Sequence, residues 1–235
     1  MADPARGTAL RGLAADSARG RALSSRGGAD DPVLVVDDLS RRFGEHEVVR
    51  RLRLTLAPGE RGALVGPNGS GKSTVLRCVA GTLIPSSGHV AVASHSAGSP
   101  EAARAVGASL GHERSFYLRL TGRANLLFFA RLRGVGRRAA ARAVDRLADE
   151  LELHEILRER ADRCSTGMLQ QLALARSLLD EPSLLVLDEP TRSLDEQAVA
   201  RFWRALDSRP QTAVLLATHR LDEVERCAVR VDLPT

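Results

Sequence analysis

The sequence has few aromatic residues, few cysteines and no long apolar run, and each shortage argues against a class of protein. Only 3% of its 235 residues are Phe, Trp or Tyr, which leaves few rings on which nucleic-acid bases could stack. Cys78, Cys164 and Cys227 are an odd number without metal or redox spacing, so we expect free, mostly buried thiols in a reducing compartment. No apolar run approaches the ~18 residues of a membrane span, and neither a transmembrane segment nor a signal peptide is expected.

Lysine is also nearly absent, although the chain is basic. The formal net charge of +5 would by itself permit binding to nucleic acid or to an anionic membrane surface. The excess charge is diffuse and is carried almost wholly by arginine, a bias that fits genome composition better than a nucleic-acid role. We therefore predict no nucleic-acid partner. Lys72 is the one lysine of the chain.

Residues 1–31 are rich in Ala, Arg, Gly, Ser and Asp and show no sustained apolar period. They are predicted to form a disordered basic tail, followed by one domain over residues 32–235. A basic arm that touches lipid headgroups is the alternative interpretation of this segment.

A glycine-rich stretch lies between a predicted buried strand at residues 62–65 and a predicted helix at residues 75–80. It matches the pattern G-x-x-x-x-G-K-[ST] and comprises Gly66, Pro67, Asn68, Gly69, Ser70, Gly71, Lys72, Ser73 and Thr74. In such a loop the glycines bring backbone N–H groups against a β-phosphate at a helix N-terminus. Lys72 then reaches the β and γ oxygens, and the Ser73 hydroxyl binds Mg²⁺. The alternative is a glycine-rich turn that only joins a strand to a helix.

Two further predicted strands end in polar residues. The apolar run at residues 183–187 ends in Asp188 and Glu189, an arrangement in which a carboxylate at the carboxyl end of a parallel strand faces bound Mg²⁺. The run at residues 212–218 ends at His219, and taken alone such a histidine is more often an ordinary capping or core residue.

The segments before the glycine-rich loop predict an antiparallel unit. Residues 33–36 form one predicted strand, and residues 48–56 form a second with the period-2 alternation of a half-buried antiparallel strand. Phe43 lies between them, where the residues alone favour a core ring over a stacking surface for a purine.

The middle of the chain, about residues 94–165, predicts an inserted helical subdomain. Thr121 is the expected N-cap of a helix over residues 125–132. Ser165 is the expected N-cap of the next helix, which runs to about residue 179.

Taken in their order along the chain, the glycine-rich loop, the helix start at Ser165, the strand ending in Asp188 and Glu189 and the strand ending at His219 resemble the nucleotide-binding domain of ABC transporters, over about residues 33–231. The resemblance implies an α/β fold, namely a P-loop NTPase core of mainly parallel sheet with an N-terminal antiparallel β subdomain and an inserted helical subdomain. It also implies ATP as substrate and Mg²⁺ as cofactor.

Carried onto this sequence, the resemblance implies a role for each motif. Phe43 takes the place of an aromatic residue that stacks on adenine. Asp188 takes that of the magnesium carboxylate, beside Ser73. Glu189 corresponds to the residue that polarises the attacking water, and His219 to a switch histidine. The signature motif, which contacts the ATP bound by the partner subunit, corresponds to Ser165, Thr166, Gly167 and Met168. The D-loop corresponds to Ser193, Leu194 and Asp195. His112 falls at the glutamine-loop position.

The signature motif and the glutamine-loop position depart from the family pattern. The signature has Thr166 and Met168 where glycine and glutamine are usual, and Thr166 adds a Cβ near the phosphate. His112 stands where the resemblance implies a glutamine. In this family that glutamine contacts the metal and couples the ATP-binding subunit to its permease.

The resemblance implies a head-to-tail dimer, with a second identical chain or a paralogue, in which each ATP lies between one subunit's glycine-rich loop and the other's signature. It further implies an ATPase at the cytoplasmic face of the membrane that powers a separately encoded permease, in the style of export systems for polysaccharides, lipids or drugs. A soluble ABC ATPase that acts on ribosomes or DNA is the alternative. A catalytically inactive regulatory module is a third class, against which Lys72 and Glu189 argue.

The connection over residues 111–125 carries an apolar cluster of Phe116, Tyr117 and Leu118. The cluster is either satellite packing under a loop or a groove that receives a short helix of the permease.

Overall fold

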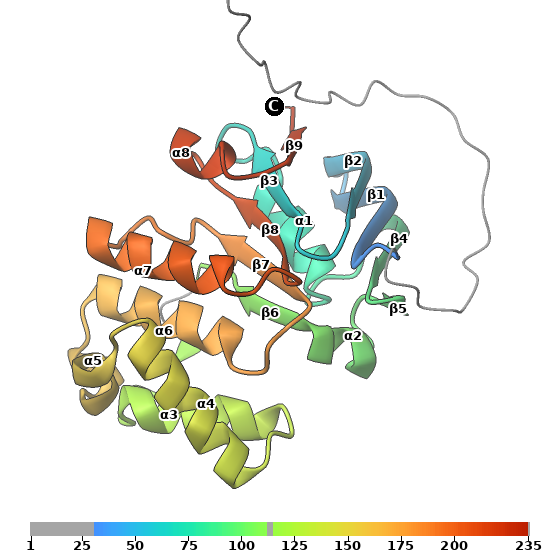
Figure 1. The fold of residues 1–235 in the computed structure, drawn as a ribbon. Coiled ribbons are helices and arrows are strands. Elements are labelled where there is room, and N and C mark those ends of the chain that lie inside the picture. Colours follow the sequence, from blue (N-terminus) through green and yellow to red (C-terminus); the bar gives the residue numbers. More distant parts are fainter. Residues whose placement is uncertain (1–30, 112–114, 235) are drawn as a thin grey trace, which may run out of the picture.

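The computed structural model describes residues 31–111 and 115–234. His112 and residues 1–30 of the predicted tail lie outside this described part. Figure 1 shows an antiparallel sheet beside a parallel sheet, with helices packed around the latter.

The parallel sheet forms the centre of the molecule. Its strands, in spatial order, are β6 (Val106–Ser109), β7 (Leu184–Asp188), β8 (Ala213–Ala217), β3 (Arg61–Val65) and β9 (Val229–Asp232). β7 and β8 are apolar without alternation because both faces of the sheet are covered. Leu184 and Val186 pack into one core cluster, whereas Leu185 and Leu187 pack into the other.

The antiparallel sheet comprises β2 (His46–Leu56), β1 (Leu34–Phe43), β4 (Ser87–Val92) and β5 (His95–Ser96), in that order. The predicted alternation on β2 holds, since Leu52, Leu54 and Leu56 are buried between exposed neighbours. These leucines share a core cluster with α1 (Lys72–Val79) and with α2 (Pro100–Ala105).

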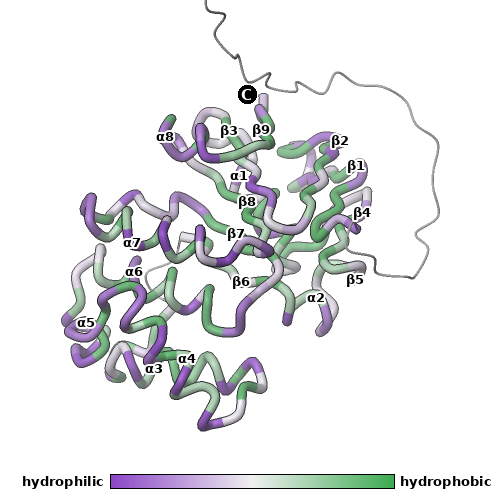
Figure 2. Tube along the Cα trace, in the orientation of Figure 1, coloured by the Kyte–Doolittle hydropathy of each residue, from purple (hydrophilic) through white to green (hydrophobic). Residues whose placement is uncertain are grey.

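The second core cluster lies beneath the remaining helices. In chain order these elements are α3 (Gly122–Leu132), α4 (Arg137–Glu150), α5 (His154–Arg158), a 3₁₀ turn (Ala161–Arg163), α6 (Thr166–Leu178), α7 (Glu196–Asp207) and the single-turn α8 (Leu221–Val224). In Figure 2 apolar residues concentrate along the strands of the parallel sheet, whereas α4 alternates between apolar and polar residues. This alternation is expected of a surface helix with one buried stripe.

The predicted α/β class is confirmed, but the helical insertion is shorter than the sequence indicated. β5, α2 and β6 all fall inside residues 94–165, and β6 pairs in parallel with β7. The helical part of this range therefore begins at α3. β6 gives a weak sequence signal because it contains small residues. A Cβ on its Gly107 would lie 2.0 Å from the Ser177 carbonyl oxygen, so only glycine allows α6 to pack this closely.

Both predicted helix caps are confirmed. The Thr121 hydroxyl accepts a hydrogen bond from the Ala124 N–H at 3.2 Å, and the Ser165 hydroxyl accepts one from the Met168 N–H at 3.2 Å. Because Thr121 caps directly, α3 begins at Gly122 rather than at residue 125.

The cysteines differ in their surroundings. Cys78 and Cys227 are buried, and Cys164 is half-buried. Burial raises the pKa of all three thiols, that of Cys227 to about 11.

Candidate functional site

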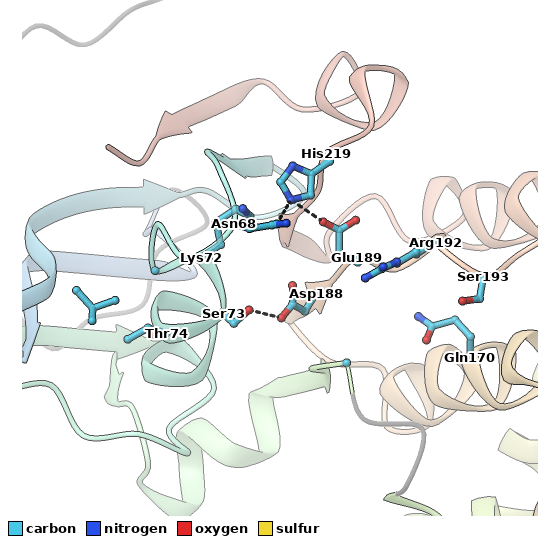
Figure 3. Close-up of a pocket in the computed structure, with 14 residues that line it drawn as sticks. Asn68, Lys72, Ser73, Thr74, Gln170, Asp188, Glu189, Arg192, Ser193 and His219 are labelled. Atoms are coloured by element: carbon cyan, nitrogen blue, oxygen red, sulfur yellow. Dashed lines mark hydrogen bonds and ion pairs between the residues drawn. The ribbon is translucent and has the colours of Figure 1, made fainter. Parts of the chain in front are cut away.

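A cleft of about 620 Å³ opens at the carboxyl ends of β3, β7 and β8. Figure 3 shows the glycine-rich loop on one side of it, and Gln170, Arg192 and Ser193 on the other. The lining residues are Val48, Asn68, Gly69, Gly71, Lys72, Ser73, Thr74, Gly111, Gln170, Asp188, Glu189, Arg192, Ser193 and His219. The topology thus brings segments far apart in sequence to one edge of the sheet.

The glycine-rich loop leads from β3 into α1 with backbone conformations that need glycine. Gly69 and Gly71 have φ values of 85° and 95°, and a Cβ on Gly71 would lie 2.9 Å from the Val48 carbonyl oxygen. The start of α1 carries no acidic residue, so its N–H groups and positive dipole end are open to an anion.

Lys72 is held ready at this helix start. Its ammonium donates hydrogen bonds to the carbonyl oxygens of Gly66 at 2.6 Å and Pro67 at 2.9 Å, and the residue is only 8% exposed. A buried ammonium that depends on backbone carbonyls gains more from a phosphate oxygen, which is an ionised acceptor.

Ser73 and Asp188 face each other across the cleft. The Ser73 hydroxyl donates to Asp188 Oδ2 at 2.6 Å (Figure 3). A hydroxyl and one carboxylate are hard oxygen ligands, and this sparse set suits Mg²⁺, which commonly binds one or two carboxylates together with phosphate oxygens and water. Within the described chain no group of three or more His, Cys, Asp or Glu could hold a metal ion. The Ser73 hydroxyl and the Asp188 carboxylate fit a magnesium ion brought in with a nucleotide.

Glu189 follows Asp188 at the end of β7 and has a strained backbone, with φ at 48°. Its N–H donates to the Ala217 carbonyl oxygen at 2.9 Å, which ties it to β8. Burial raises the pKa of its carboxyl above the ordinary value, and the nearby His219 offsets part of this rise. A strained, partly buried carboxylate at the cleft is the kind of group that accepts a proton from water.

His219, just past β8, completes this corner of the site. Its Nε2 lies 3.5 Å from Glu189 Oε1 and 3.1 Å from Asn68 Oδ1 (Figure 3). His219 Nε2 thus faces both the Glu189 carboxylate and the glycine-rich loop. This placement joins His219 to the other predicted site residues.

The residues of the predicted signature do not line this cleft. Ser165 and Thr166 are exposed at the start of α6, and Gly167 packs so closely on the D-loop that a Cβ would lie 2.6 Å from the Ser193 carbonyl oxygen. Of the D-loop residues Ser193 lines the cleft, Leu194 is half-buried and Asp195 caps α7 through the Ala198 N–H at 2.7 Å.

Phe43 lies at the end of the β1–β2 hairpin, paired with His46, and is 48% exposed. The core position favoured by its sequence context is therefore wrong, because the hairpin end projects beyond the packed part of the sheet. The guanidinium of Arg41 lies 4.5 Å from the ring centroid. Phe43 is not among the residues that line the cleft.

Four cleft residues, Val48, Gly111, Gln170 and Arg192, are absent from the sequence-based set. Gln170 projects from α6 and donates to the Pro190 carbonyl oxygen at 2.9 Å. Arg192 is exposed in the turn between Glu189 and the D-loop, and Gly111 follows β6 with φ at 70°. Arg192 could have been found from its place between two predicted motifs, whereas Gln170 and Gly111 depend on how α6 and β6 pack.

The fold and this cleft define a P-loop nucleotide-binding domain. A family model described as ABC transporter matches residues 49–192. The chain belongs to this family, and the resemblance inferred from its motifs is confirmed.

Similar proteins and structures agree with this assignment. A daunorubicin resistance ATP-binding protein of Streptomyces coeruleorubidus is 34% identical over 86% of this chain and 65% of its own length. A Nod factor export ATP-binding protein of Rhizobium etli is 35% identical over 83% of this chain and 62% of its own length. The chain thus spans less than two thirds of the length of these relatives. The solved structure of an ATP-binding subunit of an ABC transporter superposes with a TM-score of 0.76 at 28% identity, over 86% of this chain and 85% of that one.

None of the helices in the described part of the chain combines the length and the apolar character that crossing a bilayer requires.

Proposed function

We propose that this chain is an ATP-hydrolysing subunit that dimerises on ATP and powers transport, most simply export, through a separately encoded membrane permease. The observation that carries the proposal is the convergence of Lys72, Ser73, Asp188, Glu189 and His219 on one cleft. Phosphoryl transfer from a nucleoside triphosphate to water needs cations and N–H groups that bind the phosphates, together with a group that orients the water. This cleft supplies the phosphate-binding groups and the water-orienting carboxylate.

The chain's own residues divide this work. The N–H groups at the start of α1 and the Lys72 ammonium bind the phosphates. Ser73 and Asp188 would hold Mg²⁺. A bound Mg²⁺ would neutralise the negative charge that develops on the phosphate oxygens during hydrolysis. Glu189 accepts a hydrogen bond from the attacking water, and His219 holds a position between that carboxylate and the loop.

The place of the signature supports a dimer. Ser165 and Thr166 start a helix whose N–H groups would suit a γ-phosphate, yet they lie outside the lining of their own cleft. A second copy or a paralogue, arranged head to tail, would bring this helix start to the open side of the site. Each nucleotide would then lie between two chains.

An apolar surface on the helical part supports a permease partner. Tyr117 and Phe128 are exposed and stack edge to face, with centroids 4.7 Å apart. Beside them an apolar groove on α3 is lined by Leu120, Ala124, Leu127, Phe128, Arg131 and Leu132. A short amphipathic helix of a membrane subunit fits such a groove and would place the chain at the cytoplasmic face of the membrane. The relatives named for drug resistance and for Nod factor export favour an export system.

The test is the Glu189→Gln variant, assayed for ATP hydrolysis and for ATP binding. Hydrolysis should fall by about a hundredfold or more while ATP binding persists, because the amide keeps the shape of the side chain but is a poor proton acceptor. The variant should also accumulate as an ATP-bound dimer on a sizing column. A variant that hydrolyses ATP at the wild-type rate would refute the assignment of Glu189.

A further inference from the structure

A buried pair of polar side chains lies behind the cleft and outside its lining. Glu223 has no exposed surface, and Thr191 is 1% exposed. The Thr191 hydroxyl donates a hydrogen bond to Glu223 Oε1. Glu223 Oε2 is buried without a hydrogen-bond partner in the described structure. Burying a carboxyl group in this way costs folding free energy, which argues for a use beyond filling space.

The pair joins the two segments that carry the proposed water-orienting residues. Thr191 lies in the turn that follows Glu189, and Glu223 lies on α8, which follows His219. The same two segments also meet through the Glu189–Ala217 backbone hydrogen bond, the 3.5 Å approach of the His219 ring to Glu189 and a hydrogen bond from the His219 backbone to the Glu189 carboxyl.

α8 is too short to hold its own position. It contains four residues, and its first, Leu221, is 74% exposed. A single helical turn has little intrinsic stability in water, so its place depends on tertiary contacts. Beyond α8 the chain is fixed again, where the Arg226 guanidinium lies 5.0 Å from the centre of the Trp203 ring.

We propose that Glu223 is a positioning residue for ATP hydrolysis: through the Thr191 hydroxyl it holds the His219 segment against the turn that carries Glu189. The inference rests on the function proposed above. Its physical basis is that a displacement of about 1 Å at a reacting group can lower a rate by about a hundredfold. Neither residue lines the cleft, so nucleotide binding does not need the pair.

Four variants test this assignment in steady-state ATPase assays. Thr191→Val and Glu223→Leu each remove the hydrogen bond, and kcat should fall by roughly tenfold to a hundredfold with KM for ATP changed by no more than about twofold. Thr191→Ser keeps the hydroxyl and should restore most of kcat. Thr212→Val is the matched control, because it removes a hydroxyl that donates to the Pro182 carbonyl oxygen at 3.0 Å away from the cleft.

A second readout does not depend on hydrolysis. Trp203 is the one tryptophan of the chain and is 3% exposed, so acrylamide quenching of its fluorescence reports movement of the segment that holds Arg226. Quenching should increase in Thr191→Val and Glu223→Leu and stay at the wild-type level in Thr191→Ser and Thr212→Val.

The outcomes separate this inference from the proposed function. If Thr191→Val and Glu223→Leu melt at a lower temperature but keep the wild-type kcat, the pair is only structural and the inference is overturned. If the wild-type chain hydrolyses no ATP, the proposed function fails, and quenching decides the positional part: an increase in the two variants supports it, and no change overturns it.

Discussion

The surroundings of Glu189 oppose its own ionisation. Burial raises its pKa, so the folded protein binds a proton at this group more readily than the unfolded chain does. The ionised carboxylate therefore lowers the free energy of unfolding at neutral pH. This cost decreases as the pH falls through the raised pKa, and it is absent below the pKa of the unfolded chain, about 4.3.

We predict that Glu189→Gln is more stable than the wild type at pH 7 without nucleotide or magnesium. The gain should be about 1 kcal/mol or less, because the side chain keeps contact with water, which screens it. Thermal melts of both proteins at pH 7 and at pH 4.5 check this, and the difference in Tm should shrink at the lower pH. A variant that is less stable than the wild type at both pH values would contradict the prediction.

Lys72 should contribute to nucleotide affinity rather than to the fold. In Lys72→Ala the affinity for ATP should fall by roughly tenfold to a hundredfold, which corresponds to about 1.5–3 kcal/mol for a charge-assisted hydrogen bond. Titration with a fluorescent ATP analogue measures the change. Lys72→Arg is the matched variant and should also bind weakly, because a planar guanidinium does not replace a compact ammonium between two loop carbonyls.

At the scale of elements, the close packing of β6 on α6 depends on one glycine. Gly107→Ala should destabilise the protein by about 1–3 kcal/mol, since the new Cβ would lie 2.0 Å from the Ser177 carbonyl oxygen and must push helix and strand apart. Urea unfolding measures the loss. Gly136→Ala is the control, because no atom lies within 4 Å of a Cβ there, and it should change stability by less than about 0.5 kcal/mol. Equal losses in the two variants would show that the close approach does not matter.

The sequence predicts elements well where one local pattern is enough. β3 and β7 are short apolar runs that end at chemistry-bearing residues, and the caps Thr121 and Ser165 mark the starts of α3 and α6. β6 escaped prediction because its conformation is imposed by partners, β7 on one edge and α6 on one face. The exposed position of Phe43 was not predicted because nothing in the sequence shows that the hairpin end extends past the core.

The cleft shows the same division. The motifs on β3, β7 and β8 are predicted together because their order along the chain resembles one family, and the structure joins them because the carboxyl ends of neighbouring parallel strands share one edge. Thr191 and Glu223 are not predicted, because their hydrogen bond links positions 32 residues apart and neither belongs to a recognised motif. Long-range polar contacts of this kind follow from tertiary packing and leave no periodic trace in the chain.

At the scale of the whole molecule, the exposed aromatic pair should matter only in the proposed complex with a membrane permease. Tyr117→Ala should leave ATP binding and most basal hydrolysis of the isolated subunit intact, because the side chain is 51% exposed and lies outside the cleft. It should reduce co-purification with the permease by about tenfold, as expected for an aromatic anchor. Ile84→Ala is the control, since Ile84 is also exposed but lies near the antiparallel sheet. Full assembly and transport by Tyr117→Ala would place the docking surface elsewhere.

The unequal burial of the three cysteines gives the unmodified chain its own chemical label for assembly. The pKa of all three thiols is raised, but only Cys78 and Cys227 are buried, so alkylating agents reach these two more slowly than Cys164. Cys164 is half-buried and directly precedes Ser165 at the edge that a second subunit would cover. One thiol per chain should therefore react in the monomer, and its alkylation should slow when ATP is added to Glu189→Gln. The ratio of the Cys164 alkylation rates with and without ATP would report the fraction of chains in the closed dimer without any added label.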